Sequence, residues 1–255
     1  MSKYSELAKI PVFSIKDVEE LTNNTKTAYS FLGRKIKKGE IKKIRQNIYS
    51  WVNPTTGQIA ASNYQIACAI TSSAYISHHS ALTYYELANQ VYYEIYVSSE
   101  TRFREFMFEA TLFRYVASKL NKGIINAKNT TGVRITNLER TVIDSIKDIE
   151  KISGIEEFMS SLEIIHYLNE DKLKLYLDGY NLQFLYQKTG FLLNHYKKEL
   201  QISDSFIEYC KSKKGKSTRY LLTYDFAESY YNSAWQLIIP KDLFETTKLG
   251  EDSFV

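Results

Sequence analysis

KTAYSFLGRKIKKGEIKKIR, residues 26–45, is the stretch that decides the fold of this chain. It holds eight lysines and arginines against a single acid. At 100° per residue, Ala28, Leu32 and Ile36 fall on one side of a helix over residues 26–38. The opposite side of that helix is polar and basic. The stretch therefore predicts a helix with one face for packing and one for a charged partner.

A second helix precedes this one in the sequence. Ser14 is expected at its N-cap, and Asp17, three residues later, completes a start that resembles a capping box. Asn23 and Asn24 then form the turn to the basic helix. A further short helix is expected over residues 2–9. Two helices joined by so short a turn predict a helix-turn-helix.

After Gly39, which is expected to end the basic helix, the pattern changes from helical to alternating. Isoleucines flank a polar tip, Arg45-Gln46-Asn47, and this predicts a two-stranded wing with Gln46 and Asn47 as turn residues. Helix, turn, basic helix and basic hairpin follow one another as in a winged helix-turn-helix that binds DNA. A winged helix used for protein contact and a merely solvated lysine-rich face are the alternatives.

The predicted DNA contacts fall into two groups. On the basic helix, the residues that face the major groove are Lys26, Thr27, Ser30, Arg34 and Lys37. On the wing, the residues that reach a phosphate or the minor groove are Lys43 and Arg45. Residues 1–53 carry a net charge of +6, whereas residues 54–255 carry −2. This imbalance confines the predicted nucleic-acid contact to the N-terminal part of the chain.

The length of 255 residues favours two domains, and the class that we predict is α+β. We expect a winged helix-turn-helix domain over residues 1–54 and a larger mixed α/β C-terminal domain over residues 58–255. Strand-like patterns in the second part cover residues 92–97, 110–116, 133–135 and 234–239. Helices are expected over residues 58–74, after Ser77, after Asn137, and over residues 154–168, 170–178, 181–199 and 203–212.

Catalytic and metal-binding motifs are missing from the sequence. The four histidines have neither HExxH nor zinc-site spacing, and there is no glycine-rich phosphate loop and no GxSxG. Glu170 and Lys172 resemble half of a nuclease ExK motif, but the preceding aspartate in a strand is absent. We expect no catalytic residues, no cofactor and no metal site, and therefore no enzymatic activity.

Two charged clusters outside the N-terminal part have competing interpretations. Arg140 and Asp144 lie four residues apart on one helix face, and a structural ion pair is the favoured interpretation. The lysines and the arginine of residues 211–219 form a second basic cluster. They are either a solvated helix end or a contact for nucleic acid or an acidic partner, and the sequence leaves this open.

The cysteines and the absence of long apolar segments indicate the cellular compartment. Cys68 and Cys210 are far apart and belong to no CxxC motif, which favours a reducing cytosol. No apolar run follows Met1, and no window approaches 18 uninterrupted apolar residues. We therefore expect a cytoplasmic protein with no membrane partner.

Several strings, taken in order, resemble the AbiEi-type antitoxins of bacterial type IV toxin–antitoxin systems. They are the segment from FSIKDVEELT to IRQNIYSWV, YISHHSAL from Tyr75, VRITNLERTVIDSI from Val133, QKTGFLLNHY from Gln187 and SKKGKSTRYL from Ser212. Together they cover most of the chain. One departure is Asn47, which stands where the resemblance leads us to expect glycine, although asparagine tolerates positive φ.

The resemblance implies an antitoxin of an abortive-infection, phage-defence system. The winged helix would bind inverted repeats in the promoter of its own operon and repress it, acting as a monomer or weak dimer that can bind cooperatively. The C-terminal domain would oppose a nucleotidyltransferase-like toxin without needing a stable complex with it. Ser77, Arg140 and Asp144 are the antitoxin-domain residues that the resemblance singles out.

Two other functions remain open at this point. One is a winged-helix transcription factor whose mixed α/β body senses a small molecule and has no antitoxin role. The other is an enzyme, such as a nuclease, that uses the winged helix for targeting. The sequence gives neither the operator nor the target of the toxin.

Overall fold

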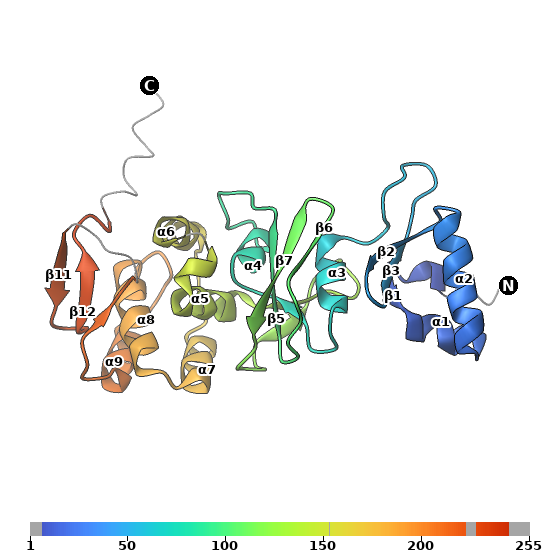
Figure 1. Cartoon of the computed structure of the whole chain (residues 1–255). Coiled ribbons are helices and arrows are strands. Elements are labelled where there is room, and N and C mark those ends of the chain that lie inside the picture. The colour runs from blue at the N-terminus through green and yellow to red at the C-terminus, as the bar shows by residue number, and fades with distance from the viewer. Residues whose placement is uncertain (1–6, 153, 223–227, 245–255) are drawn as a thin grey trace, which may run out of the picture. The chain divides into compact units, whose positions relative to one another are not determined.

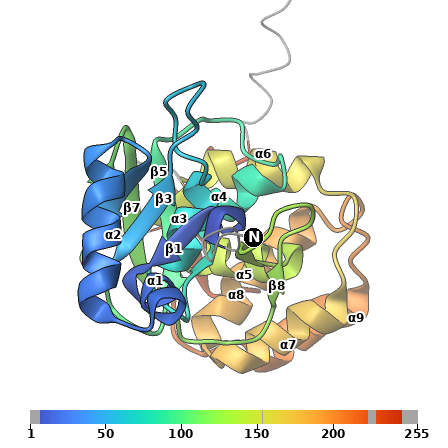
Figure 2. The same cartoon turned by 90° about the vertical axis from the view of Figure 1, so that its right-hand side faces the viewer.

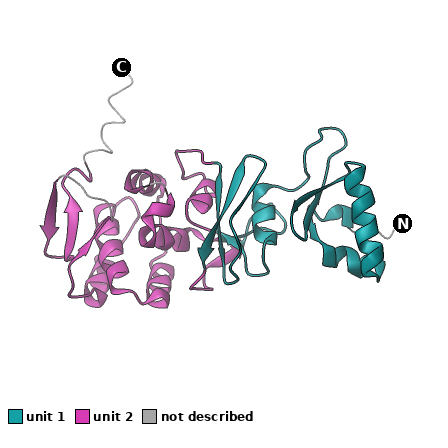
Figure 3. Cartoon of the chain, viewed as in Figure 1, with its two compact units in different colours: residues 1–76, 93–117, 126–135 teal, residues 77–92, 118–125, 136–255 magenta. Residues whose placement is uncertain are grey.

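The computed structural model of the chain describes residues 7–152, 154–222 and 228–244. The fold is mixed α+β, with helices and a wing at the N-terminal end and a larger mixed region after it (Figure 1), so the predicted fold class is confirmed. Two compact units interleave along the chain (Figure 3). Unit 1 is residues 1–76, 93–117 and 126–135, and unit 2 is residues 77–92, 118–125 and 136–255. The predicted domain boundary after residue 54 lies inside unit 1 and remains a prediction.

Unit 1 begins with the helix-turn-helix and its wing. The elements are the 3₁₀ helix η1 (Leu7–Lys9), β1 (Val12–Ser14), α1 (Ile15–Thr22), α2 (Thr25–Lys37), β2 (Ile41–Arg45) and β3 (Ile48–Trp51). Most of the helix expected over residues 2–9 lies outside the described residues. The other elements match the predicted order, and β1 is an addition that three residues were too few to reveal.

Local capping explains where α1 and α2 begin. The Asp17 amide donates to the Ser14 hydroxyl (3.4 Å) and the Ser14 amide donates to the Asp17 carboxylate (2.6 Å), so the predicted capping box is confirmed. Asn23 ends α1 in the left-handed region, with φ 51°. The Asn24 side chain then caps α2 by accepting a hydrogen bond from the Thr27 amide at 3.0 Å.

Gly39 ends α2, as its position in the sequence predicted. Its φ is +72°, and its amide donates to the Ile36 carbonyl at 2.9 Å. The Glu40 amide donates to the Lys35 carbonyl at 3.0 Å, which completes a Schellman motif. The chain leaves this motif directly into β2, so the motif sets the direction of the wing.

The wing strands form an antiparallel sheet in the order β1-β3-β2. Asn47, with φ 62°, makes the tip turn that glycine was expected to make. The sheet and both helices enclose a small core that includes Phe13, Val18 and Phe31. Ile36 had been predicted on the packed side of α2, but it is 38% exposed. Phe31 is buried instead, because the packed stripe is centred nearer to Ala28 and Leu32.

A second sheet follows the wing. Its strands are β4 (Tyr75–Ile76), β5 (Glu94–Ser99), β6 (Phe106–Phe108), β7 (Thr111–Ala117), β8 (Ile124–Asn126) and β9 (Arg134–Thr136), in the order β6-β7-β5-β4-β9-β8. β5 and β7 pair in parallel, as do β4 and β9. The helix predicted over residues 58–74 is much shorter, α3 (Asn63–Ala69), because Ser62 and Gln65 form a capping box that fixes its start.

Unit 2 is mainly helical. Its elements are α4 (His78–Tyr84), α5 (Leu138–Lys147), η2 (Ile149–Ile152), α6 (Ile155–Ile164), α7 (Glu170–Tyr180), α8 (Gln183–His195), α9 (Asp204–Lys213), β10 (Arg219–Tyr220), β11 (Ser229–Asn232) and β12 (Leu237–Pro240). α8 packs on α9, and α5 packs on both α7 and α8 (Figure 2). The late helices predicted from the sequence are confirmed to within a few residues. Among the described residues, no helix combines the length and the apolar character needed to cross a bilayer.

One close contact explains how the last sheet packs on α8. A Cβ atom on Gly190 would lie 2.2 Å from the ring of Trp235, so only glycine fits at this point of the helix. Gln187, one turn earlier, donates to the carbonyls of Ser217 (3.1 Å) and Trp235 (3.0 Å). The strings from Gln187 and from Ser212 that carried the family resemblance are therefore in contact.

The Schellman glycine leads to a first prediction. Gly39→Ala should lower the free energy of unfolding by about 1–2 kcal/mol, because an L-residue is strained at positive φ. Gly33→Ala, in the exposed middle of α2, should raise it by about 0.5–1 kcal/mol through helix propensity. An added Cβ meets no atom within 4 Å at either site, so only the backbone conformation differs. Urea denaturation of both variants checks this, and shifts of the same sign would contradict it.

Candidate nucleic-acid interface and a buried polar network

The face of α2 predicted to enter the major groove is exposed along its whole length. The exposed side chains on it are Lys26, Thr27, Ser30, Arg34 and Lys37. The opposite face is closed by Ala28, Phe31 and Leu32, which are buried. α2 thus presents a basic stripe that the described residues of unit 1 leave uncovered.

The positive charge of Lys26, at the start of α2, destabilises this helix. Lys26 lies in the first turn, where no acid is present, and a cation there interacts unfavourably with the positive end of the helix dipole. The lysines and the arginine of the last turn are, by contrast, favourably placed. Helix stability therefore accounts for the basic residues at one end of α2 but not for Lys26. An anionic partner would account for both.

The two predicted wing contacts differ in the structure. Lys43 is exposed on β2. The Arg45 guanidinium instead lies 4.6 Å from the ring centre of Phe106 and 5.8 Å from that of Phe103. Burial lowers the pKa of Arg45, and within the described part of the chain its Nη1 atom has no hydrogen-bond partner. Ring contacts thus hold the half-buried guanidinium of Arg45 against unit 1, and the predicted contact of Arg45 with DNA stays a prediction.

A second contact holds the wing in the same way. The Lys42 ammonium lies 2.8 Å from the Glu109 carboxylate and 5.4 Å from the ring centre of Phe108. Phe103, Phe106 and Phe108 all lie on or just before β6, which the sequence did not predict as a strand. Three-residue strands carry too little alternation to be recognised, so these contacts could not be foreseen.

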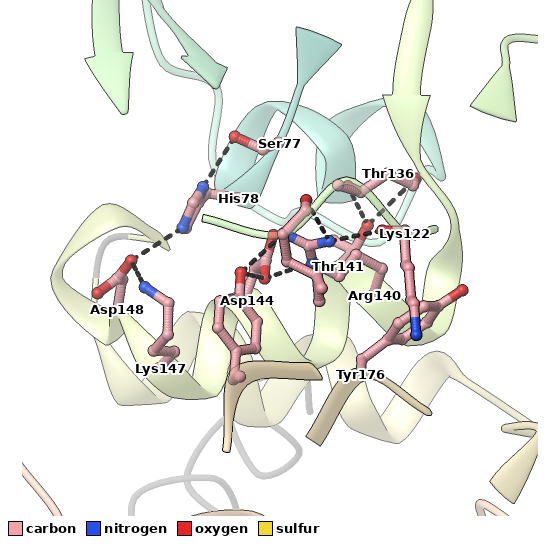
Figure 4. A network of polar contacts seen from close by, with 12 residues as sticks. Ser77, His78, Lys122, Thr136, Arg140, Thr141, Asp144, Lys147, Asp148 and Tyr176 are labelled. Carbon is pink, nitrogen blue, oxygen red and sulfur yellow. Dashed lines mark hydrogen bonds and ion pairs between the residues drawn. The ribbon is translucent and has the colours of Figure 1, made fainter. Parts of the chain in front are cut away.

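In unit 2, Arg140 is the centre of a buried polar network (Figure 4). Its Nε donates to Asp144 at 2.7 Å, and its other nitrogens donate to the carbonyls of Leu120 (3.0 Å) and Lys122 (2.5 Å) and to the Tyr180 hydroxyl (2.7 Å). Tyr180 in turn donates to Asp144 at 2.6 Å. With this set of partners, Arg140 and Asp144 have the geometry of a structural ion pair.

Ser77, His78 and Asp148 form a hydrogen-bonded series beside this network (Figure 4). His78 Nδ1 lies 2.8 Å from the Ser77 hydroxyl, and its Nε2 lies 3.3 Å from Asp148. Burial alone would raise the pKa of Asp148, but the His78 hydrogen bond and the Lys147 charge hold that pKa below its ordinary value. His78 has a φ of 53°, an unusual conformation for a non-glycine residue. His78 and Asp148 are 70 residues apart, so no local motif pointed to them.

A serine, a histidine and an aspartate in line suggest nucleophilic catalysis, but the surroundings do not favour it. A nucleophile must reach a substrate carbonyl. Ser77 is fully buried and His78 is 2% exposed, so the hydroxyl cannot meet a substrate in this conformation. The series instead fixes the start of α4, where Ser77 is the N-cap and makes no capping hydrogen bond from its side chain.

Two strings that carried the family resemblance, far apart in sequence, meet in the structure. In unit 1, β4 pairs in parallel with β9 through Ile76 and Ile135. In unit 2, the helices that follow these strands, α4 and α5, pack together, and the Tyr85 hydroxyl donates to the Thr136 carbonyl at 2.8 Å. YISHHSAL and VRITNLERTVIDSI therefore have the same arrangement, a strand followed directly by a helix, and the two strands and the two helices are neighbours.

The second basic cluster is partly neutralised. Lys211 pairs with Glu208 at 2.7 Å, and Lys213 lies 3.7 Å from Asp178. Lys216 and Arg219 are exposed. Both interpretations of this cluster stay open.

Metal and thiol chemistry have little support among the described residues. No group of three or more histidine, cysteine, aspartate or glutamate side chains there could hold a metal ion. Cys68 and Cys210 are both free and buried. Burial raises the pKa of the Cys210 thiol to about 12 and also raises that of Cys68, although backbone hydrogen bonds to Arg134 and Ile76 oppose the rise at Cys68.

These features define a class of protein, a mixed α+β chain with an N-terminal helix-turn-helix and wing. The structure is similar to the crystal structure of the RV2827C protein from Mycobacterium tuberculosis, with a TM-score of 0.62 and 14% sequence identity. The similarity covers 92% of this chain and 89% of that chain, and at this identity it shows the fold alone. No protein-family model matches the sequence, and no curated protein matches it.

The placement of Arg45 leads to a second prediction. Arg45→Met should leave the free energy of unfolding within about 1 kcal/mol of wild type, because the thioether keeps a contact with the aromatic rings. It also removes a partly buried charge with an unpaired N–H. Arg45→Ala should cost roughly 1–2 kcal/mol through the lost ring contacts. Thermal and urea unfolding measure both, and an equal loss in the two variants would show that Arg45 has a polar partner.

The Arg140 network leads to a third prediction. Arg140→Met should lower the free energy of unfolding by about 3–5 kcal/mol, because Asp144 would be left buried without its charge partner. Arg114→Met is the matched control, since that guanidinium also pairs with a carboxylate, Glu94, but is 39% exposed. It should cost at most about 1 kcal/mol. Similar losses of unfolding free energy in both variants would mean that burial is not what makes the loss of the Arg140–Asp144 ion pair so costly.

Proposed function

We propose that this chain is a DNA-binding regulator that represses its own operon, and that it is the antitoxin of a type IV toxin–antitoxin pair. The observation that carries the DNA-binding half is the uncovered basic face of α2. Its side chains include Thr27 and Ser30 as well as three cations, so it can donate to base edges and to phosphates alike. The wing supplies Lys43 beside it.

Charge favours DNA over the protein-contact and solvation alternatives. A solvated helix gains nothing from a lysine in its first turn, whereas a helix that lies against phosphates does. Arg34 is exposed, and the one hydrogen bond that it donates among the described residues is long, from Nε to the Ser30 carbonyl at 3.4 Å. Its guanidinium is therefore free to form the two-point contact that recognises guanine.

The antitoxin half rests on the resemblance of sequence strings and on the way those strings meet around α4 and α5. Under this proposal the partner is a nucleotidyltransferase-like toxin, opposed without a stable complex, and the chain itself has no enzymatic activity. Ser77, Arg140 and Asp144 would then support the antitoxin region as its framework, since all three are buried. The operator would be an inverted repeat in the chain's own promoter, bound by two copies.

A cavity favours a second candidate function, the ligand-sensing regulator. A hollow of about 340 Å³ in unit 1 lies beside the wing sheet, with Ile10, Val12, Gln65 and Cys68 among its lining residues. This volume falls within the range of small-molecule sites. A rise in melting temperature with a small molecule, lost when Cys68 is enlarged to Phe, would favour sensing over an antitoxin role.

The fourth prediction tests the DNA-binding half. Arg34→Ala should weaken binding to the chain's own upstream DNA by about 1–3 kcal/mol, because a contact to a base edge is lost. The control is Lys198→Ala, an exposed lysine of unit 2, which should bind as wild type does. Fluorescence anisotropy at two salt concentrations, with a scrambled duplex, measures both. Equal weak binding of the wild-type chain to the two duplexes would contradict autorepression.

The same variant separates the two halves of the proposal. In cells that express the neighbouring nucleotidyltransferase-like gene, Arg34→Ala should restore growth as well as the wild-type chain does, because the antitoxin region is intact. If neither the wild-type chain nor Arg34→Ala restores growth, the antitoxin half of the proposal is wrong and only the DNA-binding half remains. Growth restored by wild type alone would show that neutralisation acts through DNA.

A further inference from the structure

The wing is fixed to the body of unit 1 at two points along β2. Lys42 meets Glu109 and the ring of Phe108, and Arg45 stacks on Phe106 and Phe103. β2 is an edge strand of the wing sheet, and β6 is an edge strand of the central sheet. Side-chain contacts therefore link these two edges at both ends of β2.

The loop between β5 and β6 lies at the Arg45 end of this contact. Phe103 in the loop is buried, and its ring packs edge-to-face on Tyr115 with 5.2 Å between centres. Glu105 accepts a hydrogen bond from the Tyr115 amide at 3.2 Å. The loop is thus anchored at both of these residues, and its conformation does not depend on a partner.

Arg102 and Arg104 flank the buried Phe103 and are exposed. They line an open hollow of about 570 Å³ together with Phe103, Glu105 and Tyr115. Glu105, the acid of this hollow, is engaged with Arg114 at 3.4 Å. In the part of the chain that the structure describes, neither Arg102 nor Arg104 forms an ion pair. The loop therefore presents two guanidinium groups on a fixed backbone.

We propose that the DNA-binding surface extends from the wing onto this loop, where Arg102 and Arg104 contact phosphates of the same duplex. This rests on the proposed DNA-binding function. The ring of Phe103 lies 5.8 Å from the Arg45 guanidinium, and the Cα atoms of its two neighbours are each about 3.8 Å from its own Cα. The loop that carries the two arginines therefore lies next to β2, the wing strand that also carries Lys43.

Arginine suits this role chemically. Its planar guanidinium forms two parallel hydrogen bonds to a phosphate and is weakly hydrated. Phosphate contacts fix the orientation of a duplex without reading its sequence. The loop would then add affinity equally on operator and scrambled DNA, and α2 would carry the sequence preference. Arg45 is a positioning residue in this arrangement, because it aligns the wing with the loop and does not touch DNA.

The test is the salt dependence of binding by the full chain. Arg102→Gln with Arg104→Gln should reduce the slope of log K against log salt by about 1.8, since each phosphate contact contributes about 0.9. Affinity should fall by the same factor for the operator and the scrambled duplex. Lys119→Gln with Lys198→Gln removes two exposed charges from unit 2 and should leave the slope unchanged. Circular dichroism and melting confirm that each variant is folded.

The outcomes separate this inference from the function on which it rests. A wild-type chain that shows no preference for the operator would overturn the proposed function and the inference together. A wild-type chain with that preference, but an unchanged slope in the double variant, would overturn the extended surface alone. A loss confined to the operator would assign the two arginines to base contacts and contradict the phosphate role.

Arg45 is tested by the same measurement. Arg45→Met keeps the ring contacts and should retain the wild-type slope, whereas Arg45→Ala should lose part of the loop's contribution. A slope reduced by about 0.9 in the methionine variant would mean that Arg45 itself neutralises a phosphate, and its positioning role would be wrong.

Discussion

A buried guanidinium needs hydrogen-bond partners, and each nitrogen of Arg140 has one, contributed mainly by segments that are distant in sequence. Through it, α5 is bound to the backbone of residues 120–122 and to Tyr180 of α7. Asp144, one turn along the same helix, balances the charge. Because removing any partner would leave a polar group unpaired in the interior, this network allows one arrangement of these segments. The network thereby joins α5 to α7 and to residues 120–122.

The basic residues of α2 are placed in the opposite way. Charges in unit 2 that are buried have partners, whereas the cations on the outer face of α2 remain exposed to solvent. Exposed cations add little to stability, and Lys26 even opposes its own helix. Their physical consequence is an electrostatic field around one face of unit 1, which attracts polyanions and releases their counterions. The buried charges that stabilise the fold are thus in unit 2, and the charges available to a polyanion are on α2, as the proposed DNA-binding function requires.

On the wing, basic residues take both roles: some pack against the protein, and others stay exposed for a partner. Lys42, Lys43 and Arg45 lie on the same strand, and the sequence predicted a DNA contact for Lys43 and Arg45. In the structure, Lys42 is exposed but pairs with Glu109 and lies over the ring of Phe108, Arg45 is half-buried against Phe106, and Lys43 is exposed. A bulge between Lys43 and Arg45 shifts the alternation of side chains, so the direction of each one could not be deduced from spacing. In the proposed DNA surface, Arg45 is accordingly a positioning residue, and the exposed Arg102 and Arg104 are the contacts next to the wing.

The sequence by itself determined the local features. The capping box at Ser14, the asparagine turn, the glycine stop after α2, the two faces of that helix and the late helices all follow from interactions between residues a few positions apart. Only the tertiary structure decided the rest. This includes the short strands β1, β4, β6 and β8, the pairing of β4 with β9, the partners of Arg140 beyond Asp144, the series from Ser77 to Asp148, and the packing of Arg45. These depend on contacts between residues tens of positions apart, and no periodicity within a short window records them.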